Sequence, residues 1–191
     1  MRNTRLDAGG LGADAAEVIE RARRGDQEAW RRIYGGYAGR VAGYLRVQGA
    51  KEAEDLTSEI FLAVFRNLHS FQGDEPQFRS WLFVIAHRRL IDERRKLARR
   101  DEVSLDSTLD FGSSIDVADV AISRIGSRGV EDLCAELVPD QRDVLLLRLV
   151  ADLTIEQTAE VVEKSVGATK ALQRRGLAAL AKLTERQGVP L

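Results

Sequence analysis

The chain has 191 residues, of which 44% are hydrophobic and 31% are charged, so it can bury one or two hydrophobic cores and is not disordered as a whole. Its formal net charge is −1, yet residues 1–100 carry a net +5, residues 101–127 a net −5 and residues 128–191 a net −1. The total charge gives no hint of nucleic-acid binding, whereas its segregation predicts two functional modules joined by a different connector.

Cysteine and histidine are scarce, which excludes two further classes of protein. Cys134 stands alone, so no intramolecular disulfide forms, and with only His69 and His87 there is no Cys/His cluster for structural zinc. We expect no metal and no cofactor. No apolar run approaches the ~20 residues that span a bilayer, and the N-terminus lacks an apolar signal core. These patterns predict a soluble, cytoplasmic protein without direct membrane insertion.

The N-terminal segment predicts a tail followed by a pair of helices. Residues 1–13 are rich in glycine and lack any period, which predicts a disordered tail. Asp14 is a candidate N-cap for a first helix, and Asp26, after Gly25, is a candidate cap for a second. An aromatic stripe then includes Trp30, Tyr34, Tyr37 and Tyr44. We interpret this stripe as helix packing, with base stacking as the alternative.

Residues 54–100 predict two helices around a short aromatic loop. Apolar residues at helical spacing predict a buried face on the first helix: Leu56, Ile60, Phe61, Val64, Phe65 and Leu68. Gly73 and Pro76 stop this periodicity within the loop from His69 to Gln77. The helical periodicity resumes at Trp81. The far end of this second helix carries seven cations: Arg88, Arg89, Arg94, Arg95, Lys96, Arg99 and Arg100.

The cation cluster favours contact with a polyanion, because cations along one helix neutralise phosphates and release counterions. A solvated helix face is the alternative. An aromatic ring beside such a surface offers a stacking platform to an unpaired base, worth ~1–3 kcal/mol per base. Phe71, in the polar loop, is the better candidate for this platform. Trp81 lies on the apolar stripe and is interpreted as core.

Three blocks of this stretch resemble region 2 of an extracytoplasmic-function (ECF) sigma factor of bacterial RNA polymerase: Glu54–Leu62, Phe71–Gly73 and Phe78–Ala86. The resemblance implies that one face of the first helix docks on the coiled coil of the polymerase β′ subunit, through Asp55, Glu59, Phe61 and Leu62. Ser58 replaces the usual Gln, which removes one side-chain amide from this contact. Asp55 and Glu59 share a helical face, but no His, Cys or Ser is suitably placed to make them a catalytic pair.

The same resemblance implies that the aromatic loop and the start of the second helix capture a flipped base of the promoter −10 element. The candidate residues are His69, Phe71 and Arg88. The family pattern Ile-Ala-Arg-Asn is Ile85-Ala86-His87-Arg88 in this chain. Asn offers donors and an acceptor, whereas Arg only donates, so the family's base preference does not carry over to Arg88.

Residues 101–127 predict an acidic, flexible linker. From Asp101 to Asp119 there are six acidic residues, no basic one, and scattered apolar residues without a sustained period. One interpretation is a plain disordered linker. The resemblance implies instead a connector that threads the RNA path of the polymerase and is displaced by the growing transcript.

Residues 128–186 predict a helix-turn-helix. Pro139 suits the first turn of one helix, Thr154 and Gln157 form a capping box for the next, and Ser165 caps a longer third helix. Two helices joined by a short turn, the second rich in Lys and Arg, are typical of this motif. Its outward residues are Lys170, Ala171, Arg174 and Arg175. Arg can bridge guanine O6 and N7, whereas Lys170 is expected at phosphate.

The segment Ser165–Lys170 resembles the Ser-x-Gly-Thr-Val-Lys of sigma region 4, whose recognition helix reads the −35 element. Two departures accompany it. Glu163 replaces the usual turn glycine, and Leu172 replaces a frequent arginine, which removes one expected phosphate contact.

We therefore predict an all-α protein of two helical domains: a tail (1–13), sigma region 2 (14–100), an acidic linker (101–127) and sigma region 4 (128–186). The resemblance implies an ECF sigma factor that binds core RNA polymerase through its β′ and β subunits, binds promoter DNA weakly on its own, and initiates transcription under the control of an anti-sigma factor. A helix-turn-helix regulator that acts without the polymerase is the alternative. An enzyme with a small-molecule substrate is disfavoured, since no phosphate loop, metal spacing or nucleophile–base pair occurs.

Overall fold

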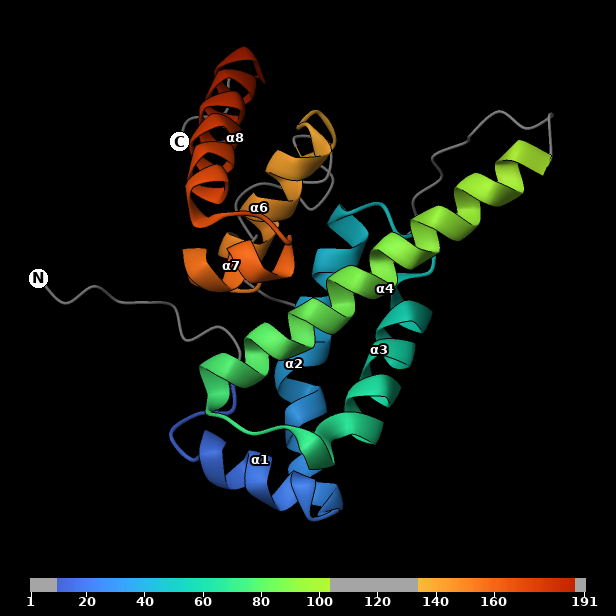
Figure 1. The fold of residues 1–191 in the computed structure, drawn as a ribbon, viewed down its shortest axis with the longest axis vertical. Helices are drawn as coiled ribbons and strands as arrows, with labels where there is room; N and C mark the ends of the chain where they lie inside the picture. The colour runs from blue at the N-terminus through green and yellow to red at the C-terminus, as the bar shows by residue number, and fades with distance from the viewer. Residues whose placement is uncertain (1–9, 104–133, 188–191) are drawn as a thin grey trace, which may run out of the picture.

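The structure, a computed structural model, describes residues 10–103 and 134–187. Within these ranges it is built from helices alone, which confirms the all-α fold class (Figure 1). The α-helices are α1 (Ala15–Arg23), α2 (Gln27–Val47), α3 (Ala53–Asn67), α4 (Glu75–Val103), α6 (Pro139–Leu149), α7 (Ile155–Val161) and α8 (Val166–Gln187), and a 3-10 helix, η1 (Leu68–Ser70), follows α3. No helix among the described residues is both long enough and apolar enough to cross a membrane.

The expected linker and tail fall mostly outside the described residues. Residues 104–127 of the linker, 1–9 of the tail and 128–133 of the C-terminal domain are in this position. Two corrections concern the ends that are described. The helix α4 continues through residues 101–103, and Leu11, expected within the tail, is 4% exposed and accepts a hydrogen bond from Arg32 Nη2 at 3.0 Å.

Helices α1 to α4 form the N-terminal domain, in which α4 crosses the α2 and α3 pair (Figure 1). Its core confirms the packing interpretation for two tyrosines of the aromatic stripe, whereas Tyr34 is 42% exposed. Tyr37 and Tyr44 are fully buried and lie against Phe78 and Phe83, with ring centroids 5.6 Å apart in both pairs. Rings of this kind bury large apolar areas and favour tilted or edge-on contacts.

Of the two predicted N-caps, Asp26 caps its helix through its side chain and Asp14 does not. The Asp26 carboxylate accepts hydrogen bonds from the backbone N–H groups of Glu28 and Ala29, at 2.9 and 3.2 Å, as a helix cap does. Asp14 occupies the N-cap position of α1 but accepts no capping hydrogen bond. Its carboxylate instead pairs with both Nη atoms of Arg32, at 2.6 and 2.8 Å, because α2 brings that guanidinium alongside.

The aromatic loop is shorter than predicted, because Pro76 lies inside α4 and does not end a helix. Asp74 and Gln77 form a reciprocal cap: the backbone N–H of Asp74 donates to Gln77 Oε1 at 2.9 Å, and that of Gln77 donates to Asp74 Oδ1 at 3.0 Å. Proline is well tolerated in a first helical turn, where its missing N–H would have no partner. The capping side chains thus decide where α4 begins.

Helices α6 to α8 form the C-terminal domain, in which α7, a short turn and α8 make the predicted helix-turn-helix. The capping box is confirmed: Thr154 Oγ1 accepts from the Gln157 N–H at 3.2 Å, and Gln157 Oε1 accepts from the Thr154 N–H at 2.9 Å. Ser165 Oγ accepts from the Ala168 N–H at 3.2 Å at the start of α8. Between these helices, Glu163 has a φ of +54°, a backbone conformation that glycine adopts at less cost.

The two domains are docked, with α7 packed against α4 (Figure 1). A single hydrophobic core continues from one domain into the other. The C-terminal members of this core are Cys134, Leu146, Leu147, Ala151, Leu153 and Val161. Separating the domains therefore exposes apolar surface, which by itself favours the docked arrangement in water.

Candidate nucleic-acid and polymerase interfaces

The helix α8 presents its predicted cations outward. Lys170, Arg174 and Arg175 are exposed and Ala171 is half-buried, whereas Thr169 on the opposite face is fully buried. Among the described residues no acidic side chain pairs with these three cations, although Arg175 Nε donates to the Ala171 carbonyl oxygen at 3.3 Å. The four predicted residues thus lie together on the N-terminal half of one helix. A recognition helix meets the major groove with this part.

The cations of α4 do not form one free surface. Arg89 and Arg99 are exposed, while Arg95 and Lys96 lie 3.8 and 3.4 Å from carboxylates of their own helix. Arg94 points inward and donates to the backbone and side-chain oxygens of Gln48, both at 2.8 Å. Arg94 therefore belongs to the domain interior and not to the predicted polyanion surface.

The structure corrects the predicted exposure of Phe71. Its side chain is 8% exposed and stacks on Trp81, with ring centroids 5.2 Å apart and an interplanar angle of 30°, while Phe78 lies edge-on at 5.6 Å. The loop is polar in sequence, yet α4 supplies aromatic partners that bury this ring. Phe71 is therefore not open to a base in this conformation. His69, in contrast, is exposed, with Nδ1 2.9 Å from the Arg66 carbonyl oxygen.

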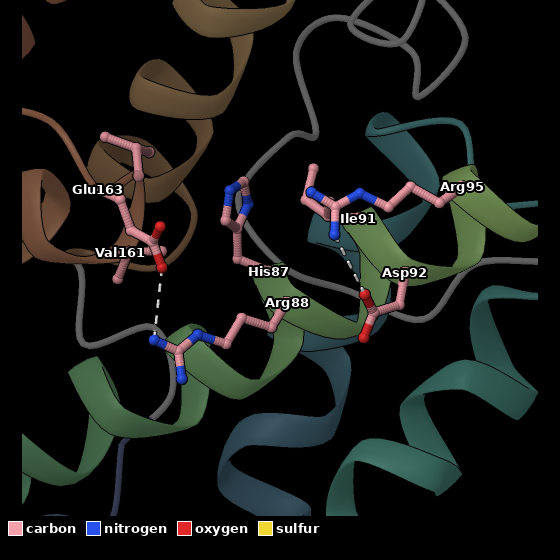
Figure 2. A pocket seen from close by; sticks show the side chains of 8 residues that line it. His87, Arg88, Ile91, Asp92, Arg95, Val161 and Glu163 are labelled. Carbon is pink, nitrogen blue, oxygen red and sulfur yellow. Dashed lines mark hydrogen bonds and ion pairs between the residues drawn. The ribbon is translucent and has the colours of Figure 1, made fainter.

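Arg88, the third predicted −10 residue, faces the other domain. Its Nη2 lies 3.4 Å from Oε1 of Glu163, the residue in the turn between α7 and α8 (Figure 2). A groove runs beside this pair between α4 and α7, with His87 and Ile91 on one wall and Val161 on the other. Both Arg88 and Glu163 depart from the family pattern, and the fold places the two departures side by side.

Three of the four residues predicted to contact the polymerase are exposed on α3. Asp55, Glu59 and Leu62 are exposed, and Leu62 retains 49% of its accessible surface. Phe61 is corrected: it is 2% exposed and packs edge-on against Tyr34 with ring centroids 4.8 Å apart, so it cannot touch a partner. Phe61 packs against α2, and this contact determines which part of the apolar stripe on α3 faces water.

Phe65 also differs from its predicted role, but by being exposed where Phe61 is buried. It was expected in the buried stripe but is 52% exposed, resting edge-on against Trp30 at 5.0 Å. Leu62 and Tyr34 are also exposed, at 49% and 42%, and the Tyr34 ring contacts Phe61, the residue before Leu62. The name apolar patch is used below for Tyr34, Leu62 and Phe65. Contiguous exposed apolar side chains mark interaction sites more often than single ones do. The sequence carried a signal for it, since Phe65 lies three residues from Leu62 and so close to it on a helix.

A buried polar cluster joins the two domains, and sequence patterns gave no sign of it. Gln48, at the end of α2, donates from Nε2 to Asp143 Oδ1 of α6 at 2.5 Å, and these side chains are 3% and 8% exposed. Beside them the Tyr44 hydroxyl lies 2.8 Å from His87 Nδ1. Burial lowers the pKa of His87, against the opposing effect of the Asp143 carboxylate, so this histidine is neutral at pH 7. Burial also raises the pKa of Tyr44, so its hydroxyl is not a ready nucleophile.

A second polar contact lies nearer the start of α4. Arg79 Nη1 lies 3.1 Å from Asp152 Oδ2, in the loop between α6 and α7, and Gln157 Nε2 donates to the Pro76 carbonyl oxygen at 3.0 Å. Arg40 of α2 is close by, and burial, together with the charge of Arg79, lowers the pKa of its guanidinium. Asp152 thus supplies negative charge from the C-terminal domain to a pair of arginines in the N-terminal one.

The part of the chain that the structure describes contains no set of side chains that could bind a metal ion. No three His, Cys, Asp or Glu side chains gather there in a way that would hold an ion. Burial raises the pKa of the Cys134 thiol, which therefore stays protonated and unreactive at neutral pH. The described surfaces suit the recognition of a nucleic acid and of proteins.

Each of the two domains matches a known protein family. The family described as "Sigma-70 region 2" matches residues 27–100, and that described as "Sigma-70, region 4" matches residues 135–182. The chain is 34% identical over 170 residues to the ECF RNA polymerase sigma factor BldN of Streptomyces coelicolor. The aligned residues cover 87% of this chain and 64% of BldN. The chain thus spans less than two-thirds of the length of that relative.

Two solved structures share the fold. That of CnrH in complex with the cytosolic domain of CnrY has a TM-score of 0.67 at 22% identity, covering 91% of this chain and 99% of CnrH. That of the sigma factor RpoE with the anti-sigma factor NepR, from Bartonella quintana, has a TM-score of 0.65 at 18% identity, covering 90% and 94%. At these identities the likeness concerns the fold alone.

Proposed function

The chain belongs to the sigma-70 family, in its ECF group, and we propose that it directs core RNA polymerase to specific promoters and thereby starts transcription. The observation that carries the proposal is the presence of two surfaces of opposite character on separate domains. On α8, Lys170, Arg174 and Arg175 offer exposed positive charge, and on α3, Asp55 and Glu59 flank exposed apolar side chains. Unpaired cations suit DNA phosphates and bases, whereas an acidic and apolar helix face suits a protein.

We assign the −35 element to α8. Arg174 and Arg175 are placed to reach guanine edges in the major groove, and Lys170 to reach phosphate. Ala171, half-buried between them, leaves room for a base edge or a thymine methyl group. Leu172 is 8% exposed, so the position of the missing family arginine faces the domain core.

We assign the −10 element to the loop before α4 and the first half of α4, with His69 in the loop and Arg88 near the middle of the helix as the exposed contacts. Phe71 contributes to this site indirectly, because its buried ring stacks on Trp81 and fixes the position of that side chain. Trp81 is half-buried and keeps part of its surface open to solvent.

We assign core polymerase to the face of α3, where Asp55, Glu59 and Leu62 are joined by Phe65 and Tyr34 of the apolar patch. The partner that this surface fits is a helix with apolar side chains flanked by basic ones, and we propose that the β′ coiled coil is this partner. Contact of the C-terminal domain with the β subunit is part of the same proposal. The protein makes and breaks no bond in this role, and its place is the cytoplasm, where the polymerase and promoter DNA are found.

We also propose that an anti-sigma factor controls the chain. The two solved structures described above are complexes, and one partner is named an anti-sigma factor. Affinity purification from the native cells under several growth conditions tests this point. Failure to recover any stoichiometric partner would remove it without touching the promoter assignment.

The test of the main function is in vitro transcription with core polymerase that lacks any sigma subunit. Adding the protein is expected to give discrete start sites on genomic promoter fragments. Arg174→Ala is expected to lower this activity at least tenfold, and Lys182→Ala, an exposed change farther along α8, serves as the matched control. Tight, specific promoter binding without core polymerase would favour an independent helix-turn-helix regulator instead.

A further inference from the structure

We propose that Arg88 and Asp92 together select one guanine–cytosine pair at the still-paired end of the −10 element, with Arg88 on the guanine and Asp92 on the cytosine. The inference rests on the proposed function and deepens it, because it names the base pair that the chain prefers. It starts from two exposed side chains of α4, which retain 69% of the accessible surface of Arg88 and 57% of that of Asp92.

Arg88 and Asp92 lie one turn apart on α4 and share a face of that helix (Figure 2). Among the described residues each has its ion-pair partner elsewhere: Arg88 Nη2 is 3.4 Å from Glu163 Oε1, and Asp92 Oδ1 is 3.8 Å from Arg95 Nη1. Both contacts are long and exposed to solvent, so they contribute little and are readily exchanged for others. The helix therefore presents a donor group and an acceptor group side by side.

This donor and this acceptor match the major-groove edge of a guanine–cytosine pair. Arginine carries five N–H donors and no acceptor, which suits guanine, because its O6 and N7 both accept. An ionised aspartate only accepts, which suits the N4 amino group of cytosine. The two side chains thus fit the two bases of one pair.

The other three arrangements of a base pair fit less well. Adenine or cytosine at Arg88 would turn an amino donor toward the guanidinium, and the thymine or guanine opposite would turn an acceptor toward the Asp92 carboxylate. Thymine at Arg88 offers one acceptor, O4, where guanine offers two. On the strand that faces Arg88 we therefore expect guanine to rank first, thymine second, and adenine and cytosine last.

The position of Arg88 along α4 places the selected pair in duplex DNA. In the proposed −10 site the unpaired base lies near the loop, and Trp81 at that end precedes Arg88 by seven residues, or ~10 Å of helix. This distance corresponds to about three base-pair steps. An α-helix fits the major groove of a duplex, and Arg99, exposed farther along α4, offers its charge to a phosphate.

The Asp92 carboxylate distinguishes this site from a contact of Arg88 with phosphate. A phosphate is an anion, and a carboxylate one helical turn from the guanidinium repels it. A base edge carries no net charge, and its donor and acceptor atoms satisfy both side chains at once. Glu163 Oε1 lies at the guanidinium in the structure, and the guanine acceptors take its place in the promoter complex.

The experiment is in vitro transcription by core polymerase with the full chain, on a promoter library. Each pair of the −10 element and each of the few pairs upstream of it is changed in turn to all four arrangements. At one pair the wild type is expected to favour guanine–cytosine at least tenfold over adenine–thymine, with the order of the four bases given above.

Two variants test the two contacts separately. Arg88→Gln should lower the ratio of guanine–cytosine to adenine–thymine activity at least tenfold, because glutamine pairs with adenine N6 and N7. Asp92→Ala should lower the same ratio roughly threefold, because it removes the repulsion of thymine O4 and leaves Arg88 on the guanine. Both side chains are exposed, so circular dichroism is expected to show that both variants keep the wild-type helix content.

Arg99→Ala is the control for a cation of the same helix that meets only phosphate. It is expected to weaken every member of the library by a similar factor and to leave the order of the bases unchanged. A base analogue then tests one atom of the guanine. Replacing the selected guanine by 7-deazaguanine removes the N7 acceptor but keeps base pairing, and it should lower wild-type activity roughly fivefold while leaving Arg88→Ala unaffected.

The outcomes separate this inference from the proposed function. Discrete start sites without a guanine preference at any pair overturn the inference and leave the sigma-factor proposal standing. The same holds if the preference survives Arg88→Gln, or if Arg88→Ala weakens all library members equally, as loss of a phosphate contact would. The absence of discrete start sites on every library member removes the proposed function and the inference together.

Discussion

The carboxylate of Glu163 lies 3.4 Å from the guanidinium of Arg88, across the contact between the two domains. The family pattern has glycine and asparagine at these positions, so the chain has replaced two uncharged residues by an oppositely charged pair. Glu163 tolerates a φ of +54° to present its side chain there. A bulky residue in this left-handed region costs roughly 1–2 kcal/mol, which exceeds the contribution of an exposed ion pair.

This strain predicts that Glu163→Gly stabilises the fold. Glycine removes the steric cost, offset by about 0.4–1 kcal/mol for the greater freedom of the unfolded chain. We expect the free energy of unfolding to be about 0.5–1 kcal/mol higher for Glu163→Gly than for Glu163→Gln, which removes the charge but keeps the strain. Urea denaturation of both variants measures the difference. Equal stabilities would show that the turn carries no strain.

The close approach of α8 to α6 predicts that Gly176→Ala is destabilising. A Cβ at this position would lie 2.8 Å from Leu145 Cδ1 and 3.1 Å from its Cγ, inside van der Waals contact. We expect a loss of about 1–3 kcal/mol in the free energy of unfolding. Gly39→Ala is the matched control, because nothing lies within 4 Å of its added methyl group on α2, and it should gain about 0.5–1 kcal/mol. A neutral Gly176→Ala would mean that the helices shift apart without cost.

The opposite exposures of Phe61 and Leu62 predict that two adjacent substitutions act on different properties. Phe61→Ala should lower the free energy of unfolding by about 3–5 kcal/mol, because its ring fills the space between α2 and α3. Leu62→Ala should leave stability within about 0.5 kcal/mol but weaken core polymerase binding roughly five- to tenfold. Thermal unfolding and a fluorescence binding assay measure the two effects. If Leu62→Ala bound normally, the apolar patch would not be the docking surface.

The burial of Phe71 predicts a similar division within the proposed −10 site. Phe71→Ala should cost about 3–5 kcal/mol of stability, through lost packing against Trp81 and Phe78, and reduce promoter opening as a consequence. His69→Ala should reduce opening with no change in stability, since the ring is exposed. Permanganate footprinting of the polymerase complex reports opening, and calorimetry reports stability. Normal opening with His69→Ala would remove this residue from the site.

Neutral, buried His87 predicts that acid destabilises the fold. Its pKa lies below the ordinary 6.5 because of burial, so the unfolded chain binds the proton first as the pH falls. The stability that neutral His87 provides is complete above about pH 6.5 and declines below it until the folded protein also binds the proton. The groups that face this ring are Tyr44 of α2, Arg94 of α4, Asp143 of α6 and Glu163 of the turn.

The measurement compares wild type with His87→Gln at about pH 7.5 and about pH 5.5, by urea denaturation. The wild type should lose more stability than the variant over this interval, and the difference between the two losses isolates His87 from the carboxylates. The same loss in both proteins would mean that His87 titrates normally in the fold.

The sequence by itself determined the helices, most of their ends and the kinship of both domains. Helix caps such as Asp26 and Thr154 act over three residues, and the helix-turn-helix follows from such short-range signals. The exposed face of α8 was also predictable, because its cations share one side of a regular helix. For these features the residues that decide the structure are neighbours in the chain.

The tertiary structure decided which side of each apolar stripe meets another helix and which remains in water. Phe61 is buried and Phe65 exposed because α2 covers only one of them, and Phe71 is buried because α4 brings Trp81 over it. The contact between Gln48 and Asp143 joins residues 95 positions apart. No periodicity encodes such a partner, because the free energy of burying a polar group depends on what the rest of the fold places beside it.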